Sequence, residues 1–356
     1  VPSEPRDRDY FFLWSYSAWS VWVALGLMYD WASLAAVAAG VRDAAAAADS
    51  VLPTRAWLVA SPVMLLAFVP LVGNAGQAPR NRDRFTRDWA VDMLNSVEPY
   101  AIIVTNGDND TFPLWYAQEV EGVRQDVIVA VATYLQTDWF VRQMIRRPTR
   151  PYDVAPSPAR THGRHWPVPA GPPLKMTFAE ADAIPPVVSL REPQLFRAGD
   201  IAATIPAGYL TRDQIVVLRL IRDSYPSRPL YFSAAEYGNA MGLGPYLLTQ
   251  GLITKLELHA ITASKDTVRI QGSYFDLPTS LALWDSVYLA PHALIRQNGW
   301  VDGASVGIGL HYAILGSILA QSAESRGDSA RARVITDTVD AMAKSARLQR
   351  ALGGGQ

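Results

Sequence analysis

The residues best suited to chemistry lie in one short acidic loop that follows an apolar run at residues 101–104. The loop comprises Asn106, Asp108, Asn109, Asp110 and Thr111. Two carboxylates one residue apart, with amide and hydroxyl oxygens beside them, are hard ligands of the kind that Mg²⁺ or Mn²⁺ prefers. Many nucleotide-sugar glycosyltransferases hold a divalent metal on a diphosphate with such an Asp-x-Asp pair after a strand. The loop is therefore a candidate ligand or metal site.

The same residue types also suit a purely structural turn. Asp and Asn accept left-handed backbone angles, bond their own main chain and cap the start of a helix. We favour this turn interpretation, because Asp-x-Asp by itself does not specify a metal. We accordingly predict no cofactor, and keep a divalent metal at Asp108 and Asp110 as the alternative.

The remaining polar residues do not have the spacing of a catalytic site, and we predict no catalytic residue. Glu119 and Glu121 are two apart on an expected helix, so at most one can turn toward the loop. His162 and His165 lie in a proline-rich stretch without a third ligand nearby. The chain has no cysteine, which excludes disulfides, thiolate metal sites and a cysteine nucleophile. It also has no serine nucleophile elbow, phosphate-binding glycine loop or zinc-protease helix.

A strand-helix-strand-helix unit is predicted to position the acidic loop. The β-branched run at 101–104 indicates a buried strand, and a second strand is expected at 127–132. Helices are expected from Thr111 and from Thr137. Since such units form parallel sheets, the loop should lie at the carboxyl edge, where open α/β sheets bind ligands.

The rest of this part is predicted to complete an α/β domain over residues 79–275, with a proline-rich loop at 148–173. Further strands are expected at 186–190, 229–232, 252–258 and 267–270, and helices at 86–97 and 211–224. A third part, residues 276–356, should be helical, with the layout of one helical-repeat hairpin.

Two uncharged stretches, at 11–29 and 56–79, predict membrane spans, since a bilayer requires about 20 apolar residues. They give residues 1–78 the form of a two-span transmembrane hairpin, with a small-residue helix expected after Asp30. Five tryptophans accompany the spans as candidate membrane-interface or partner contacts: Trp14, Trp19, Trp22, Trp31 and Trp57. The fold class is thus α/β with membrane helices, around a mainly parallel sheet.

Several segments resemble a family of bacterial inner-membrane proteins related to the transmembrane protein O-mannosyltransferases, which are GT-C-like glycosyltransferases. The central match is TNGDNDTFPLWYAQEVEGVRQDV followed by TDWFVRQM. Others are RDRDYFF, APRNRDRFTRDWAVDMLNSVEP, PLYFSAAEY and GLGPYLLTQGL. The resemblance implies a carboxyl-terminal extracytoplasmic part, whereas the catalytic acids of the family are expected in a multi-spanning half that this chain lacks. Because the sequence starts VPSEP without an initiating methionine, we expect residues upstream.

Two functions follow as expectations. The first is a non-catalytic accessory or scaffold subunit that binds other integral membrane proteins in a bacterial inner-membrane complex. The second is the acceptor-binding part of a GT-C-type glycosyltransferase. Arginines flanking the spans favour a cytoplasmic domain, but the resemblance favours the periplasm, which we adopt. The net charge of −1 gives no basic surface for nucleic acid.

Overall fold

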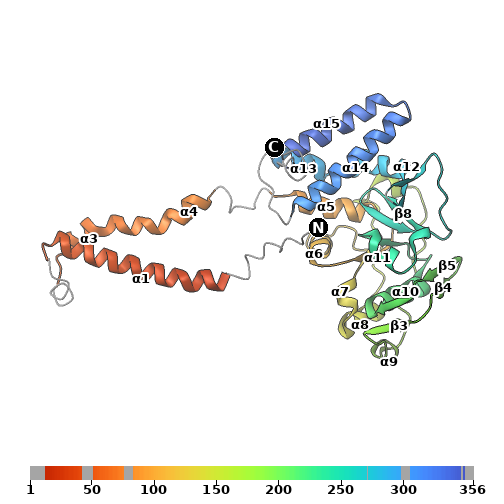
Figure 1. Ribbon diagram of the computed structural model, residues 1–356, viewed down its shortest axis with the longest axis horizontal. Coiled ribbons are helices and arrows are strands. Elements are labelled where there is room, and N and C mark those ends of the chain that lie inside the picture. The colour runs from red at the N-terminus through yellow and green to blue at the C-terminus, as the bar shows by residue number, and fades with distance from the viewer. Residues whose placement is uncertain are drawn as a thin grey trace. The chain divides into compact units, whose positions relative to one another are not determined.

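The computed structural model describes residues 13–41, 51–75, 83–270, 272–297, 305–345 and 348. The chain forms two compact units, residues 1–83 and 84–356 (Figure 1). Expectations for the first segment, for most of the loop between the two apolar stretches and for the carboxyl-terminal GGGQ lie outside the described residues.

The first unit is a pair of apolar helical segments. Helix α1 spans Leu13–Ala38, and the returning segment is built of α3 (Thr54–Ala60), the 3₁₀ helix η2 (Ser61–Phe68) and α4 (Val69–Asn74). The 3₁₀ portion begins next to a proline, which cannot donate the backbone hydrogen bond of a regular α-helix. Helix α1 packs against α3 and η2.

Helix α1 does not break at Asp30, so the prediction of a separate small-residue helix after it was wrong. The Asp30 side chain is exposed, and the alanine-rich residues that follow continue one helix of 26 residues. An exposed aspartate costs a helix only a few tenths of a kcal/mol, roughly, while alanine is the best helix former. The strong propensity downstream therefore carries the helix through.

Among the described residues, three helical segments are long and apolar enough to cross a membrane: Trp14–Ala38, Thr54–Asn74 and Val306–Ser325. The third belongs to the second unit, where it was predicted as a helix of the carboxyl-terminal hairpin. In the most apolar 18-residue window of this helix, 44% is buried inside the protein. Its apolar face therefore has packing partners within the protein.

The second unit is built on a seven-stranded sheet of order β10-β11-β8-β9-β7-β1-β2. The strands are β1 (Ile102–Thr105), β2 (Ile128–Val131), β7 (Leu230–Phe232), β8 (Leu247–Gln250), β9 (Ile253–Leu256), β10 (Thr267–Ile270) and β11 (Ser273–Asp276). Strand β1 lies between β7 and β2 and is parallel to both. The predicted parallel unit around the acidic loop is therefore present.

The sheet as a whole is mixed, so the prediction of a mainly parallel sheet was wrong. Two tight hairpins, β8 with β9 and β10 with β11, are antiparallel, and β9 also pairs antiparallel with β7. Gly251 and Gly272 lie in their turns with φ of +63° and +87°, angles that glycine adopts without steric cost. A two-residue connection can join only antiparallel neighbours.

Helices lie before and between these strands in the chain and pack around the sheet. They are α5 (Phe85–Asn95), α6 (Asp108–Glu119), α7 (Ala132–Leu135), α8 (Asp138–Arg146), α9 (Phe178–Asp182), α10 (Arg212–Ser224) and α11 (Ala235–Ala240). The remaining short elements are η3 (Ala159–Thr161) in the proline-rich loop, the pair β3 (Val187–Leu190) and β6 (Gly208–Thr211), the pair β4 (Gln194–Ala198) and β5 (Ile201–Ile205), and η4 (Gly244–Tyr246). Strands β1 and β2 are buried along their whole length, which explains their continuous apolar sequence.

The carboxyl-terminal helices are α12 (Leu277–Ser286), α13 (Ala290–Gln297), α14 (Val306–Ser325) and α15 (Ser329–Ser345). Helices α14 and α15 run side by side as an antiparallel hairpin (Figure 1). They pack in the same compact unit as the sheet, with α13 against α5.

Candidate functional site

The acidic loop between β1 and α6 is organised by Asp110. Its Oδ2 accepts the backbone N–H of Asn106 at 2.8 Å, and its Oδ1 accepts the N–H of Gly107 at 2.9 Å. The hydroxyl of Ser233, just after β7, also donates to Oδ2 at 2.6 Å. Both carboxylate oxygens thus close the turn and tie the end of β7 to the start of α6.

The other residues of the acidic loop differ in their exposure to solvent. Thr111 is buried, with its hydroxyl 2.7 Å from that of Thr105. Asn106, Asp108 and Asn109 are exposed. A metal on the Asp-x-Asp pair would compete with the three donors that already bind Asp110. Among the described residues, no cluster of three or more histidine, aspartate or glutamate side chains has the arrangement of a metal site.

A second cluster of polar side chains lies near the carboxyl ends of β2 and β7. Asp213 is buried at the start of α10, where its Oδ2 accepts the hydroxyl of Tyr237 at 2.6 Å and its Oδ1 accepts Nε2 of Gln136 at 3.3 Å. Gln136 follows β2 and Tyr237 follows β7. Burial, reinforced by Asp213, raises the pKa of the Tyr237 hydroxyl well above its usual range, so this tyrosine stays protonated and holds the carboxylate.

Sequence reasoning missed this group, because its members come from segments far apart in the chain and are brought together by the packing of α10 against α7. The available signal was that polar residues follow the ends of three strands. The predicted glutamates do not join either polar group: Glu119 pairs with Arg150 at 3.2 Å and Glu121 pairs with Arg87. His162 contacts the backbone oxygen of Ser157 at 2.9 Å.

An aromatic surface lies beside the acidic loop, formed by Phe112, Trp115, Tyr134 and Trp139 from α6, α7 and α8. The ring of Trp115 is 6.0 Å from those of both Phe112 and Tyr134, and Tyr134 is 5.7 Å from Trp139. Phe112 and Trp139 are 48% and 56% exposed. Exposed aromatic faces of this kind can bind apolar side chains or the faces of sugar rings.

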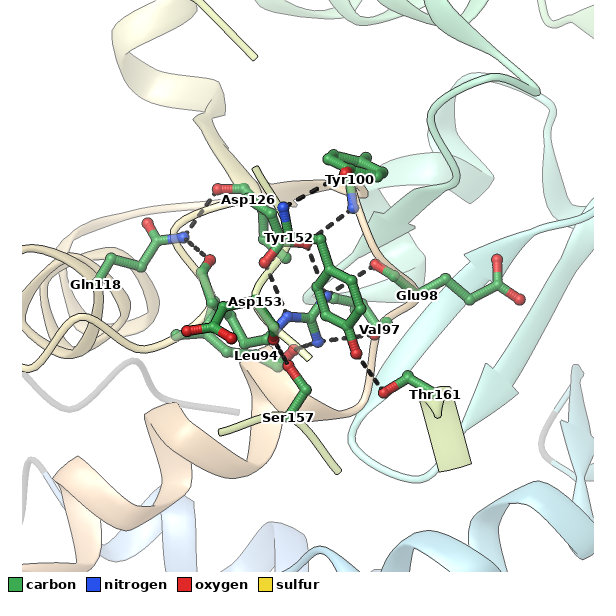
Figure 2. A network of polar contacts seen from close by, with 12 residues as sticks. Leu94, Val97, Glu98, Tyr100, Gln118, Asp126, Tyr152, Asp153, Ser157 and Thr161 are labelled. Carbon is green, nitrogen blue, oxygen red and sulfur yellow. Dashed lines mark hydrogen bonds and ion pairs between the residues drawn. The ribbon is translucent and has the colours of Figure 1, made fainter. Parts of the chain in front are cut away.

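The opposite end of the parallel strands is held by a buried arginine network, shown in Figure 2. Arg124 donates from Nη1 to the carbonyl oxygens of Leu94 and Val97 at 2.9 and 3.1 Å, and from Nη2 to that of Glu98 at 3.1 Å. Its Nε and Nη2 also bind Asp126 at 2.9 and 3.1 Å. Each edge of the guanidinium thus meets an acceptor, and the end of α5 is fixed to the start of β2.

The backbone N–H of Tyr100, the ring of Tyr152 and the backbone angle of Arg124 complete this network. The N–H of Tyr100 donates to Asp126 at 2.9 Å, and the Tyr152 ring lies over the Arg124 guanidinium at 5.3 Å. Arg124 itself has a φ of 46°, in the left-handed region, which costs about 1–3 kcal/mol. Such an angle persists because the surrounding bonds hold the residue in place, so the network is structural.

The five predicted tryptophans of the first unit fall into two groups. Trp14, Trp19 and Trp22 are 86%, 69% and 70% exposed on α1. Trp31 and Trp57 contact each other edge to face at 4.9 Å, and Trp31 Nε1 donates to the Trp57 carbonyl at 3.0 Å. The second group joins α1 to α3, whereas the three indoles of the first group are largely exposed among the described residues of this unit.

Comparison with known protein families gives one match. Residues 86–166 match the family model described as TMEM260-associated domain 2. The matched segment contains the acidic loop, the aromatic surface and the Arg124 network. Searches among curated proteins and among solved structures found no match.

Proposed function

We propose that this chain is a membrane-anchored, non-catalytic accessory or scaffold subunit that binds and stabilises a larger protein complex of the bacterial inner membrane. In this proposal the two segments of the first unit form a transmembrane hairpin, and the second unit lies in the periplasm. The observation that carries it is the placement of Trp14, Trp19 and Trp22 on α1.

These three tryptophans share one side of the helix. At 100° per residue they fall within an arc of about 140°, and Trp31 lies about 180° from its centre. Helix α1 therefore packs its Trp31 side against α3, and its opposite side, which carries the other three tryptophans, faces away from α3. Lipid tails already solvate apolar groups, so helices in a bilayer associate by close packing and polar contact, which large indoles provide.

Gentle solubilisation of native membranes tests this function. We expect the chain to migrate in a multi-subunit species, and replacing Trp19 and Trp22 together by Leu to release it, because Leu keeps the apolarity but loses the contact area. Tyr16→Leu is the matched control, because it also truncates an exposed aromatic ring but lies about 130° from the centre of the tryptophan arc. A parent protein that runs as a monomer in several mild detergents contradicts the proposal.

The side of the membrane can be tested directly, because the chain contains no cysteine. Val154 is 50% exposed in the second unit, so Val154→Cys introduces a single accessible thiol. We expect a maleimide reagent that does not cross the inner membrane to label this thiol in spheroplasts. Labelling only after the membrane is broken would place the second unit in the cytoplasm.

A second candidate, the acceptor-binding part of a GT-C-type glycosyltransferase, is favoured by the family match together with the aromatic surface inside the matched segment. Mass spectrometry of the intact natural chain separates the two candidates. Further membrane spans joined to this chain, together with sugar transfer that falls in Trp139→Ala, would support the enzyme.

A further inference from the structure

A pocket of about 240 Å³ lies beside the end of α8 and the last residue of α6. It is lined by Glu119, Gln143, Arg146, Arg147, Pro148 and Arg150, and is called the arginine pocket below. Three guanidinium groups and a single carboxylate line it. A cavity lined by an excess of one charge focuses its field and attracts ions of the opposite charge.

The partners of the three arginines leave most of this charge uncompensated. Arg150 is 3.2 Å from Glu119 in a pair whose two side chains are about half exposed, at 41% and 54%. Arg146 stacks over the ring of Phe178 at 4.4 Å, which leaves its charge in place. For half-buried Arg147, the structure shows no hydrogen bond or ion pair with any described residue.

A fourth guanidinium lies behind the pocket wall. Arg228 is 2% exposed, and its Nη2 donates to Thr149 Oγ1 at 2.6 Å and to the Gly171 carbonyl at 3.0 Å. Both acceptors are neutral, and Nη1 is buried without a partner. Thr149 stands in the chain between Pro148 and Arg150, so Arg228 adds its charge directly behind two lining residues.

The positive charges of these arginines repel one another. Burial, with a contribution from Arg150, lowers the pKa of Arg147; burial, with a contribution from Arg147, lowers that of Arg228. A buried charge without a counter-charge is costly, and like charges at short range raise that cost. An anion in the pocket would remove both penalties.

We propose that the arginine pocket binds a phosphate group. Planar guanidinium forks match phosphate oxygens in bidentate geometry, and the lining carries two more positive than negative charges, which suits a dianion. Since a water molecule occupies about 30 Å³ in the liquid, the pocket has room for a phosphate and several waters. The Gln143 amide supplies a neutral donor in the same wall.

The test uses the full chain in detergent, with inorganic phosphate as the first probe and melting temperature and calorimetric titration as readouts. We expect saturable stabilisation by phosphate, and at least about tenfold weaker binding in Arg147→Gln. Without phosphate, Arg147→Gln should melt higher than the parent, because one of the opposing charges is gone; this also shows that the variant folds. Arg147→Lys, which keeps the charge without the fork, should lie between the two.

Arg142→Gln is the matched control. Arg142 lies on the same helix, but its guanidinium pairs with Asp182 at 2.6 Å outside the pocket. It should bind phosphate as the parent does. Equal losses in Arg142→Gln and Arg147→Gln would mean diffuse ionic attraction and overturn the proposal.

A second probe distinguishes the source of the phosphate. Phosphatidylcholine vesicles with and without phosphatidic acid are compared for binding of the parent and of Arg147→Gln. Saturable binding of inorganic phosphate indicates a free phosphate, whereas a response confined to phosphatidic acid and lost in Arg147→Gln indicates a lipid headgroup. If neither probe gives a response that depends on Arg147, the pocket does not bind phosphate.

Discussion

The hydroxyl of Tyr312 donates a hydrogen bond of 2.6 Å to Asp92, a fully buried carboxyl group 220 residues earlier in the chain. Asp92 also accepts the backbone N–H groups of Leu289 and Ala290 at 2.7 and 3.0 Å. One side chain of α5 therefore caps the start of α13 and contacts α14. This carboxyl group joins the carboxyl-terminal helices to the α/β core.

The first prediction concerns the pH dependence of this junction. Burial raises the pKa of Asp92 to about 7, although the three donors oppose the shift. A pKa above its unfolded value of about 3.9 means that the folded state binds more protons between these values. The contribution of Asp92 to stability is therefore complete below about pH 4 and is lost as the pH rises through about 7, by up to about 1.4 kcal/mol per unit.

The measurement is the difference in unfolding free energy between the parent and Asp92→Asn, followed from pH 4 to 8 by chemical denaturation. That difference should shrink as the pH rises, since the amide does not titrate. Asp340→Asn, at an exposed position of α15, is the control and should give a flat difference. A parent-minus-Asn difference that grows with pH would show that the carboxylate form is the stabilising one.

The second prediction concerns the Arg124 network. Arg124→Ala should destabilise the protein by about 3–5 kcal/mol, because it leaves Asp126 buried without its counter-charge and frees three carbonyl groups. Thermal or urea unfolding measures the change. Arg142→Ala, which breaks an exposed ion pair, should have a far smaller effect. Comparable losses of unfolding free energy in the two variants would show that the buried network of Arg124 contributes no more to stability than an exposed ion pair.

The third prediction separates the turn from the metal at the acidic loop. Asp110→Asn should cost about 1–2 kcal/mol, since an amide cannot accept bonds on both of its terminal atoms, whereas exposed Asp108→Asn should be nearly neutral. Melting curves with and without Mn²⁺ should coincide for the parent. A Mn²⁺-dependent rise in the parent that disappears in both variants would favour the metal.

The fourth prediction compares two hairpin turns of the same sheet. Gly251 and Gly272 both have left-handed backbones, so Ala at either should cost about 1–2 kcal/mol. At Gly251 a Cβ would also collide with the Tyr288 hydroxyl, which accepts the N–H of Leu252 at 3.0 Å, while around Gly272 nothing lies within 4 Å. Gly251→Ala should therefore unfold at clearly lower denaturant than Gly272→Ala. Equal midpoints would mean that Tyr288 can move aside without loss.

The sequence predicts the elements around the acidic loop because each depends on local chemistry. The runs that form β1 and β2 are continuously apolar, and the residues after β1 are turn formers, so both strands and the turn role of Asp110 could be read directly. The expected break at Asp30 does not occur, because the helix propensity of the alanines that follow outweighs the small cost of one exposed aspartate.

The remaining features depend on contacts that no local pattern records. Asp92 lies in an amphipathic helix and resembles a surface acid until α13 and α14 cover it. Asp213 meets Tyr237 and Gln136 because α10 packs against α7 near the ends of β2 and β7, a contact that requires the whole fold. The mixed character of the sheet likewise follows from two short hairpins whose strands are only four residues long.

Helix α14 has a consequence for how the protein is made. It has the length and apolarity of a membrane span, yet Gly316 allows its backbone to lie against Val339 of α15 and Trp284 of α12. Synthesis proceeds from the amino terminus, so α14 emerges from the ribosome before α15 can cover it. During biogenesis, lateral entry into the bilayer and docking onto the sheet therefore compete for the same twenty residues, and the completion of α15 favours docking.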